Sequence, residues 1–356
     1  MIGYRLKLAR DAAGLSLRDL QERIGSLVTA QAIGRYERNE MMPSSTVLLA
    51  LAKAVNVSPE YLLSKRELSL SEIDFRKNPA AGAKEERAVE AIVLDHAERY
   101  LQLEELLPDV GGRWAAPVAK EFSIEGVEGA EGAAEKLRSM WKLGIDPIAS
   151  MTELLEEKGI KVVSIELPME VSGSKAFAKE AEKKTAALIV VNASHNGERQ
   201  RFTLAHELAH LVLNFEDGVS DKQQEKAADR FAGAFLVAKE MLIKLVGKSR
   251  HAISMGELIA LKGVFKVSIA ALAVRCRQLG ILTQLYFGRL WGALKSGGLV
   301  DYGSAEPEQI PPEVPSRMQR LCLRAVAEDV ISESKAAELL RISRRDLDHL
   351  LEFQGA

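Results

Sequence analysis

Residues 199–214, with the sequence RQRFTLAHELAHLVLN, decide the fold prediction for the second half of this chain. His206 and His210 stand four residues apart, and on a helix this spacing places both imidazoles on one face, one turn apart. The opposite face is predicted to be an apolar, core-facing stripe made of Leu204, Leu208, Leu211 and Phe215. The two imidazoles would therefore face a cleft and lie near enough to share one metal ion.

A catalytic zinc ion needs three protein ligands and a water molecule, so two histidines do not suffice. The helix predicted over about 221–236 offers Glu225, which we predict to be the third ligand. Asp229 lies one turn further along the same face and is predicted to accept a hydrogen bond from a ligand histidine, which fixes its tautomer. We therefore expect one Zn²⁺ per chain, although Mn²⁺ or Fe²⁺ also suits two imidazoles and a carboxylate.

Glu207 is next to a ligand in sequence but points in a different direction on the helix, so it need not bind the metal. We predict that it is the general base. A bound zinc ion lowers the pKa of its water to about 7, and Glu207 would remove the proton as that water attacks an amide carbonyl.

The composition restricts the class of protein and its location. A chain of 356 residues is too long for one ordinary core, which predicts two to three domains. Two cysteines, Cys276 and Cys322, make neither a disulfide framework nor a cysteine-based zinc site. The first ten residues do not resemble a signal peptide, and no run approaches the roughly eighteen apolar residues of a membrane span. We expect a cytoplasmic protein without a membrane partner.

The pattern of helix and strand signals predicts a mainly α fold with a small β-sheet, in the α+β class. The β-branched runs at 160–165 and 186–192 are the predicted strands. The predicted segments are a helical bundle over 1–66, a connector with a long helix over 67–130, the metal-binding domain over 131–245, a helical extension over 246–300, a Pro-rich linker over 301–315 and a C-terminal helical unit over 316–356.

The metal-binding segment resembles the ImmA/IrrE family of zinc metallopeptidases. The likeness rests on AALIVVN, RQRFTLAHELAHLVLN and EKAADRFAGAFL within residues 186–236 and covers roughly residues 130–245. It implies a zincin-like HExxH domain in which His206, His210 and Glu225 bind the metal and Glu207 is catalytic. Family members are implicated in cleaving a repressor, which implies a protein substrate here. The family often has a proline where this chain has Ala238.

The first 64 residues resemble the Xre/Cro family of helix-turn-helix regulators, on LKLARDAAGLSLRDLQERIG, TAQAIGRYERNEMMPSS and LLALAKAVNVSPEYLL. Residues 1–66 carry ten Lys/Arg and six Asp/Glu, a local charge of +4 that suits phosphate contact. The third helix would enter the major groove of a double-stranded operator, with Ile33 and Tyr36 buried as its anchors. The predicted DNA-facing residues are Ala30, Gln31, Gly34 and Arg35, and the predicted phosphate contacts are Arg18, Thr29 and Arg38.

Several alternatives stay open at this point. The metal domain could be structural or sensory in a transcription factor or antitoxin-like protein that cleaves nothing. The chain could also be a hydrolase of small substrates whose first domain only dimerises. If the first domain binds DNA, a homodimer on a two-fold operator is expected, because several helix-turn-helix modules bind DNA as dimers. Residues 331–347 read as a helix, a short turn and a helix capped by Ser343, which fits either a second helix-turn-helix or, more commonly, a packing element.

Overall fold

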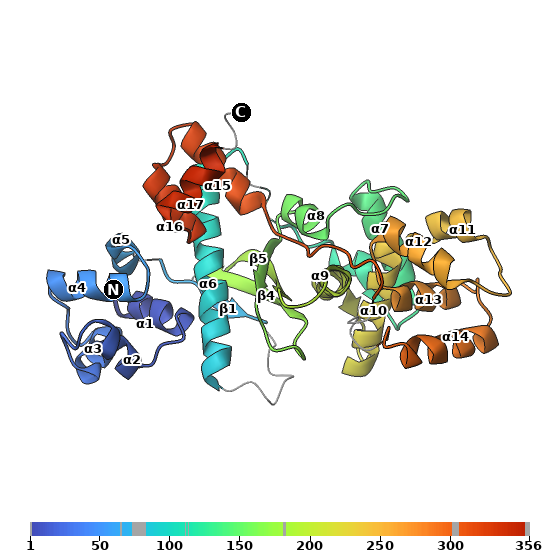
Figure 1. Ribbon diagram of the computed structural model, residues 1–356, viewed down its shortest axis with the longest axis horizontal. Helices are drawn as coiled ribbons and strands as arrows, with labels where there is room; N and C mark the ends of the chain where they lie inside the picture. Colours follow the sequence, from blue (N-terminus) through green and yellow to red (C-terminus); the bar gives the residue numbers. More distant parts are fainter. Residues whose placement is uncertain are drawn as a thin grey trace. The chain divides into compact units, whose positions relative to one another are not determined.

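The computed structural model describes residues 2–64, 66–72, 83–110, 112, 114–180, 183–300 and 306–352. The described chain is mainly helical with a small sheet, which confirms the α+β prediction (Figure 1). Contacts divide it into two compact units. The first contains residues 1–113, 176–188 and 316–356, and the second contains residues 114–175 and 189–315. The six predicted segments do not follow this division, and their boundaries stay a prediction.

The first unit begins with five short helices, in agreement with the helical bundle predicted over 1–66. They are α1 (Ile2–Ala12), α2 (Leu17–Arg23), α3 (Ala30–Glu37), α4 (Ser45–Ala54) and α5 (Pro59–Leu63). A hydroxyl side chain caps each of the last four, at Ser16, Thr29, Ser44 and Ser58. These caps satisfy backbone N–H groups that have no partner within the helix, which is why short helices can start there.

A long helix, α6 (Ala83–Leu106), connects the parts of the first unit. On one side it contacts α1, where buried Arg5 forms an ion pair with Glu98. Near its other end, Tyr100 and Leu103 share a buried core with the C-terminal helices α15 (Arg317–Ala327), α16 (Glu333–Leu340) and α17 (Arg344–Glu352) (Figure 1). The C-terminal helices therefore pack on α6, and a DNA-binding role for them stays a prediction.

The main sheet has four strands in the order β1-β4-β5-β3. The two predicted strands are β3 (Lys161–Ile165) and β5 (Lys183–Asn192). The structure adds β1 (Ser69–Ser71) and β4 (Gly173–Glu180), which pair antiparallel with Ser71 opposite Phe177. Neither was predicted, because glycine, serine, lysine and alanine are poor strand formers.

In the second unit, the helices α9 (Gly197–Val212) and α10 (Asp221–Leu236) pack against each other. On α10 the 3.6-residue period predicts an apolar core stripe of Ala228, Phe231, Ala232 and Phe235, and all four are fully buried. The other elements of this unit are the 3₁₀ helix η1 (Ala119–Phe122), β2 (Ser123–Ile124), α7 (Gly129–Met140), α8 (Met151–Glu157), β6 (Asn214–Phe215), α11 (Lys239–Val246), α12 (Met255–Phe265), α13 (Ile269–Gln278) and α14 (Gln284–Ser296).

One predicted helix break lies elsewhere. The isolated glycine within the helical stretch 254–280 predicts a break near Gly263, but α12 runs through this residue to Phe265. The helix ends at Lys266, which adopts the left-handed conformation, and Ser268 then caps α13. An isolated glycine costs a helix only about 1 kcal/mol, which packing of the neighbouring Leu261 and Phe265 offsets.

Residues 306–315, the described part of the predicted Pro-rich linker, form a strap across α9. Buried Glu306 pairs with Lys262, which also pairs with Glu198 of α9. Buried Glu313 pairs with Arg201 and accepts hydrogen bonds from the backbone N–H groups at the start of α8. The strap therefore has a packing role that the sequence did not predict, because its many prolines look like those of a solvated connector. Residues 301–305 lie outside the described part of the chain.

Replacing Glu313 with alanine would test this role. The substitution leaves the buried guanidinium of Arg201 without its carboxylate partner, and breaking a buried pair costs about 3–5 kcal/mol of the free energy of unfolding. Urea unfolding should show the loss. Glu308→Ala, at an exposed position on the same strap, should change the free energy by less than about 0.5 kcal/mol. Equal effects of the two substitutions would show that the strap does not hold α9.

Candidate metal centre and DNA-binding surface

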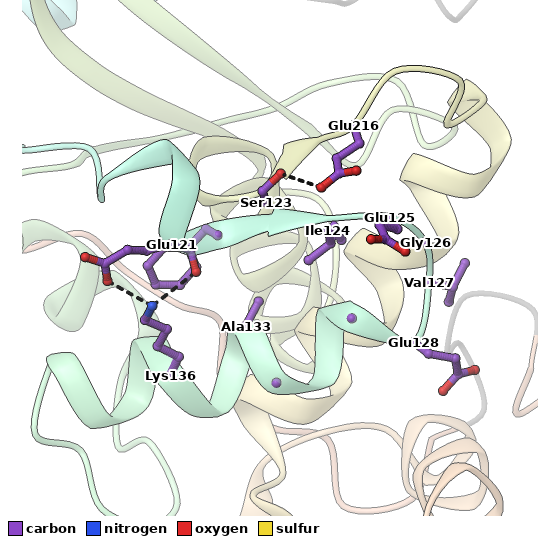
Figure 2. A pocket seen from close by; sticks show the side chains of 13 residues that line it. Glu121, Ser123, Ile124, Glu125, Gly126, Val127, Glu128, Ala133, Lys136 and Glu216 are labelled. Atoms are coloured by element: carbon purple, nitrogen blue, oxygen red, sulfur yellow. Dashed lines mark hydrogen bonds and ion pairs between the residues drawn. The ribbon is translucent and has the colours of Figure 1, made fainter.

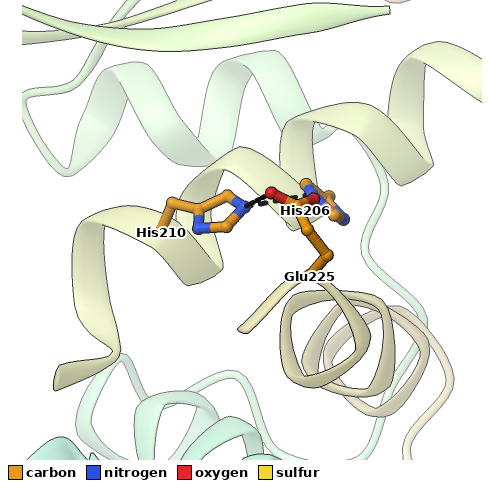
Figure 3. A group of neighbouring side chains, drawn as sticks. All are labelled: His206, His210 and Glu225. Atoms are coloured by element: carbon orange, nitrogen blue, oxygen red, sulfur yellow. Dashed lines mark hydrogen bonds and ion pairs between the residues drawn. The ribbon is translucent and has the colours of Figure 1, made fainter. Parts of the chain in front are cut away.

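Three predicted ligands meet between α9 and α10. His206 and His210 lie one turn apart on α9, and Glu225 extends toward them from the second turn of α10 (Figure 3). Their ligand atoms all lie within 4.8 Å of one another, and each side chain is partly accessible to solvent. In the described part of the chain, this is the group of histidine, cysteine or carboxylate side chains whose ligand atoms lie close enough together to hold a metal ion.

The separations between ligand atoms fit one ion. The two Nε2 atoms of His206 and His210 are 3.1 Å apart. The Glu225 carboxylate lies 3.2 Å from Nε2 of His206 and 3.8 Å from Nε2 of His210. Bonds of about 2.0–2.2 Å at tetrahedral angles separate neighbouring ligand atoms by roughly 3.3 Å. Two imidazoles and a carboxylate are also the donor set expected of a catalytic rather than a structural zinc site.

Asp229 fixes the orientation of the first imidazole. Its Oδ1 lies 3.0 Å from Nδ1 of His206, so Nδ1 donates this hydrogen bond and Nε2 faces the other two ligands. Burial alone would lower the pKa of His206, but the hydrogen bonds to Asp229 and Glu225 and the charge of Glu207 raise the pKa to about 10. In the metal-free protein the imidazole of His206 is therefore in its cationic form at neutral pH, with a proton on both nitrogens. A metal ion that binds Nε2 has to displace the proton there.

Glu207 turns away from the three ligands toward strand β4. Its Oε2 accepts a hydrogen bond of 2.8 Å from the backbone N–H of Lys175. The side chain of Lys175 in turn donates to the backbone carbonyl of His210, with an Nζ–O distance of 3.1 Å. The edge of β4 therefore lies directly beside the candidate site. The sequence did not identify Lys175, since nothing in GSKAFAKE marked this segment as a strand.

The DNA-binding candidates lie on and beside α3. Ile33 and Tyr36 are buried as predicted, and Gln21 of α2 accepts a hydrogen bond of 2.7 Å from the N–H of Ala30. The predicted DNA-facing side chains that are exposed are Arg18, Thr29, Gln31, Arg35 and Arg38, while Ala30 is half-buried. The two arginines nearest the end of α3 share an acidic neighbour, because Glu40 lies 2.6 Å from Arg38 and 3.8 Å from Arg35.

Gly34 does not face outward as predicted. It is buried, and a Cβ atom at this position would lie 3.5 Å from Leu17 of α2. The position therefore faces α2, where a Cβ atom would make an ordinary van der Waals contact with Leu17. Gly34 lies one turn from the exposed Gln31 and was expected to share its exposure, but it faces α2 instead.

A separate pocket of about 650 Å³ lies where β2 meets the start of α7 (Figure 2). Its lining mixes apolar and glycine residues with glutamates and one lysine, and Lys136 donates to the backbone carbonyl of Glu121 at 3.2 Å. The acidic residues that line it are Glu121, Glu125, Glu128 and Glu216. None of the candidate metal ligands lines this pocket, so the two features are distinct.

Comparison with known proteins matches two domains. Residues 155–277 match the family described as the IrrE N-terminal-like domain, and residues 6–62 match a helix-turn-helix family. The chain is 37% identical over 68 residues to the HTH-type transcriptional regulator ImmR of Bacillus subtilis (strain 168). That match covers 19% of this chain and 52% of the relative, so the chain spans about half of the relative's length.

The chain therefore carries a helix-turn-helix domain of the Xre type at its start and an IrrE/ImmA-like peptidase-family domain further along. The first match contains α2 and α3, and the second contains α9, α10 and the three residues of the candidate metal centre. No described helix is both long enough and apolar enough to cross a membrane.

Zinc binding should release a proton from His206, because its folded pKa of about 10 lies above the usual 6.5. The protonated imidazole stabilises the metal-free fold fully below pH 6.5, and this contribution is lost as the pH rises through about 10. Calorimetry in buffers of different ionisation enthalpy should find about one proton released from this group per zinc ion at pH 8. Asp229→Asn should release fewer, whereas Asp221→Asn, in the first turn of the same helix, should match the wild type. Equal proton release by Asp229→Asn would contradict the assigned hydrogen bond.

Proposed function

We propose that this chain is a DNA-binding transcriptional regulator whose second domain is a zinc-dependent endopeptidase that cleaves a repressor or another regulatory protein. The observation that supports the catalytic part is the convergence of His206, His210 and Glu225 with Glu207 alongside. A structural metal site has no need of that additional glutamate. A cytoplasmic location and a homodimer on a two-fold operator belong to the same proposal.

A zinc ion in this site would polarise the scissile carbonyl and acidify a water molecule. The residues of the chain supply the rest. His206 and His210 present Nε2 atoms to one point, and Asp229 keeps the His206 ring in the required tautomer. Glu207 accepts the proton of the attacking water and passes it to the departing amine, as a general base that becomes a general acid.

Glu207→Gln tests the catalytic part. The glutamine keeps the shape of the side chain but cannot accept the proton, so the rate of cleavage should fall at least about 100-fold. The measurement is cleavage of purified candidate regulatory proteins, the product of the adjacent gene among them, followed by gel electrophoresis and mass spectrometry with zinc-loaded protein. Glu216→Gln, at an exposed site beyond α9, is the control and should cleave normally.

The outcome also decides between the two main readings. Abolition of cleavage by Glu207→Gln and by chelation supports the peptidase. An intact repressor with wild-type protein, together with operator binding that survives Glu207→Gln, supports a transcription factor whose metal domain is structural or sensory.

For the DNA-binding part we propose that α3 enters the major groove. Gln31 suits the bidentate edge of adenine, and Arg35 suits guanine or a phosphate. The exposure of both side chains, with α3 fixed to α2 through Gln21, supports this assignment. Arg18, Thr29 and Arg38 are the proposed phosphate contacts. Glu40 opposes binding, because it neutralises Arg38 and adds a negative charge near the DNA.

Two substitutions with opposite effects test the DNA-binding surface. Arg35→Ala should weaken binding to operator fragments selected from the genome by about 1–3 kcal/mol. Glu40→Gln should strengthen it and increase its salt dependence, since Arg38 is freed for a phosphate. Fluorescence anisotropy at several salt concentrations measures both. Lys120→Ala, outside the helix-turn-helix domain, should bind like the wild type, and a weaker Glu40→Gln complex would count against this surface.

A further inference from the structure

The first compact unit contains two separate apolar cores. The DNA-binding module, α1–α5, has a core of its own that includes Leu6, Ile33 and Leu62. The C-terminal unit, α15–α17, shares a second core with the later turns of α6. Among the residues described, the two cores have none in common, so each part is held together by its own apolar packing.

A pocket of about 590 Å³ lies between the two parts. One wall comes from the end of α4 and the start of α5, with Lys53 and Ser58, and the other comes from α16, with Ser334 and Lys335. Most of the lining residues are polar, so water can fill the pocket. The DNA-binding module and the C-terminal unit therefore face each other here across solvent and not across a dry interface.

The side chain of Arg341 crosses from the C-terminal unit to the module at this pocket. Its Nη1 donates to the carbonyl oxygen of Asn56, just after α4, at 2.5 Å, and its Cζ lies 5.4 Å from the centre of the Tyr61 ring in α5. Its other two nitrogens donate to Asp95 of α6, at 2.5 Å and 3.3 Å. One arginine at the end of α16 therefore connects the module, α6 and the C-terminal unit.

Release of Arg341 would leave no buried charge without a partner. Breaking a buried ion pair is normally costly, because one charge stays buried and unpaired. Here Asp95 also accepts a hydrogen bond of 2.8 Å from Arg99, which remains. Asn56 and Arg341 both line the pocket, where water can replace the bonds that they lose. The attached and the detached states therefore both satisfy their polar groups.

The contact between α1 and α6 is of a different kind. Arg5 pairs with Glu98 and also donates to Ser64 and to the carbonyl oxygen of Arg66. The side chain of Arg5 is 1% exposed, whereas that of Arg341 is 25% exposed. Separation of the Arg5 pair would leave buried charges unpaired. The α1 contact is therefore the permanent attachment of the module to α6, and the Arg341 contact is the accessible one.

We propose that Arg341 is a releasable latch between the DNA-binding module and the C-terminal unit. With the latch closed, the module keeps one orientation relative to α6. With the latch open, α1–α5 turn as a rigid body about the α1–α6 contact, since their core is complete without the other parts.

The latch controls the direction of the recognition helix and not access to it, because Gln31 and Arg35 are exposed in the closed state. The C-terminal unit thus acts on DNA binding as an anchor that does not itself touch DNA. This inference goes beyond the proposed function and does not require the peptidase.

Distances between two spin labels test the latch in the full-length protein. One label is placed on the module at Leu49→Cys and the other on the C-terminal unit at Ala327→Cys, both at exposed positions. The native Cys276 and Cys322 are buried, and burial raises their thiol pKa values to about 11 and about 12, so they should escape labelling. Arg341→Asn removes the guanidinium but keeps the left-handed backbone at the end of α16, which asparagine tolerates.

The Arg341→Asn protein should give a distribution of label distances at least about twofold broader than that of the labelled parent. Arg344→Asn is the matched control and should stay narrow, because Arg344 pairs within the C-terminal unit, with Glu333 and Asp348. In the labelled parent, about 1 M salt, with a Debye length of roughly 3 Å, should broaden the distribution as the substitution does. Equal widths for Arg341→Asn and the parent would overturn the latch, and a width that salt leaves unchanged would overturn its release.

Two further measurements separate release from unfolding. Labels at Glu90→Cys on α6 and at Ala327→Cys report on two elements that share a core, so their distance distribution should stay narrow in every case. Hydrogen exchange within α1–α5 should be the same in Arg341→Asn and in the wild type, because the module keeps its own core. Faster exchange throughout α1–α5 would show that Arg341 stabilises the fold of the module, which contradicts movement as a rigid body.

Discussion

The packing of α9 against α10 is the constraint on which the candidate centre depends. The apolar faces of the two helices are buried together, so the polar residues opposite them have to face a common space. Helical periodicity then sets which residues these are. The imidazoles of His206 and His210, one turn apart on α9, lie close to the carboxylate of Glu225 on α10. Asp229, one turn further along α10, forms a hydrogen bond with the other ring nitrogen of His206, Nδ1. A shift of one residue in either helix would separate the donors.

The surroundings of α9 hold this geometry in place from both ends. Near its start, buried ion pairs connect Glu198 and Arg201 with Lys262, Glu306 and Glu313. Gly197 lies so close to the strap that a Cβ atom there would meet the carbonyl oxygen of Pro311 at 2.2 Å. Toward its end, β4 contacts the helix through Lys175. Buried charged pairs depend on correct geometry, so they favour one position of α9 over others.

Much of the candidate site could be predicted from the sequence, because its signals are local. The i, i+4 spacing of His206 and His210 and the apolar stripe on α10 follow from the 3.6-residue period, and the structure brings Glu225 and Asp229 to the expected face. Lys175 could not be predicted, because its role depends on strand pairing between distant segments and on a backbone N–H, which every residue type except proline has. The burial of Gly34 and of Glu313 likewise depends on tertiary contacts, with α2 and with Arg201, that no periodicity reveals.

Zinc K-edge X-ray absorption of the purified protein tests the central claim most directly, since it reports which atoms surround the metal. Two imidazole nitrogens and carboxylate or water oxygens at about 2.0–2.2 Å are expected in the wild type. In Glu225→Ala the spectrum should change, with the carboxylate contribution lost and both imidazoles retained. A sulfur shell at about 2.3 Å, fewer than two imidazoles, or identical spectra for the two proteins would contradict the account.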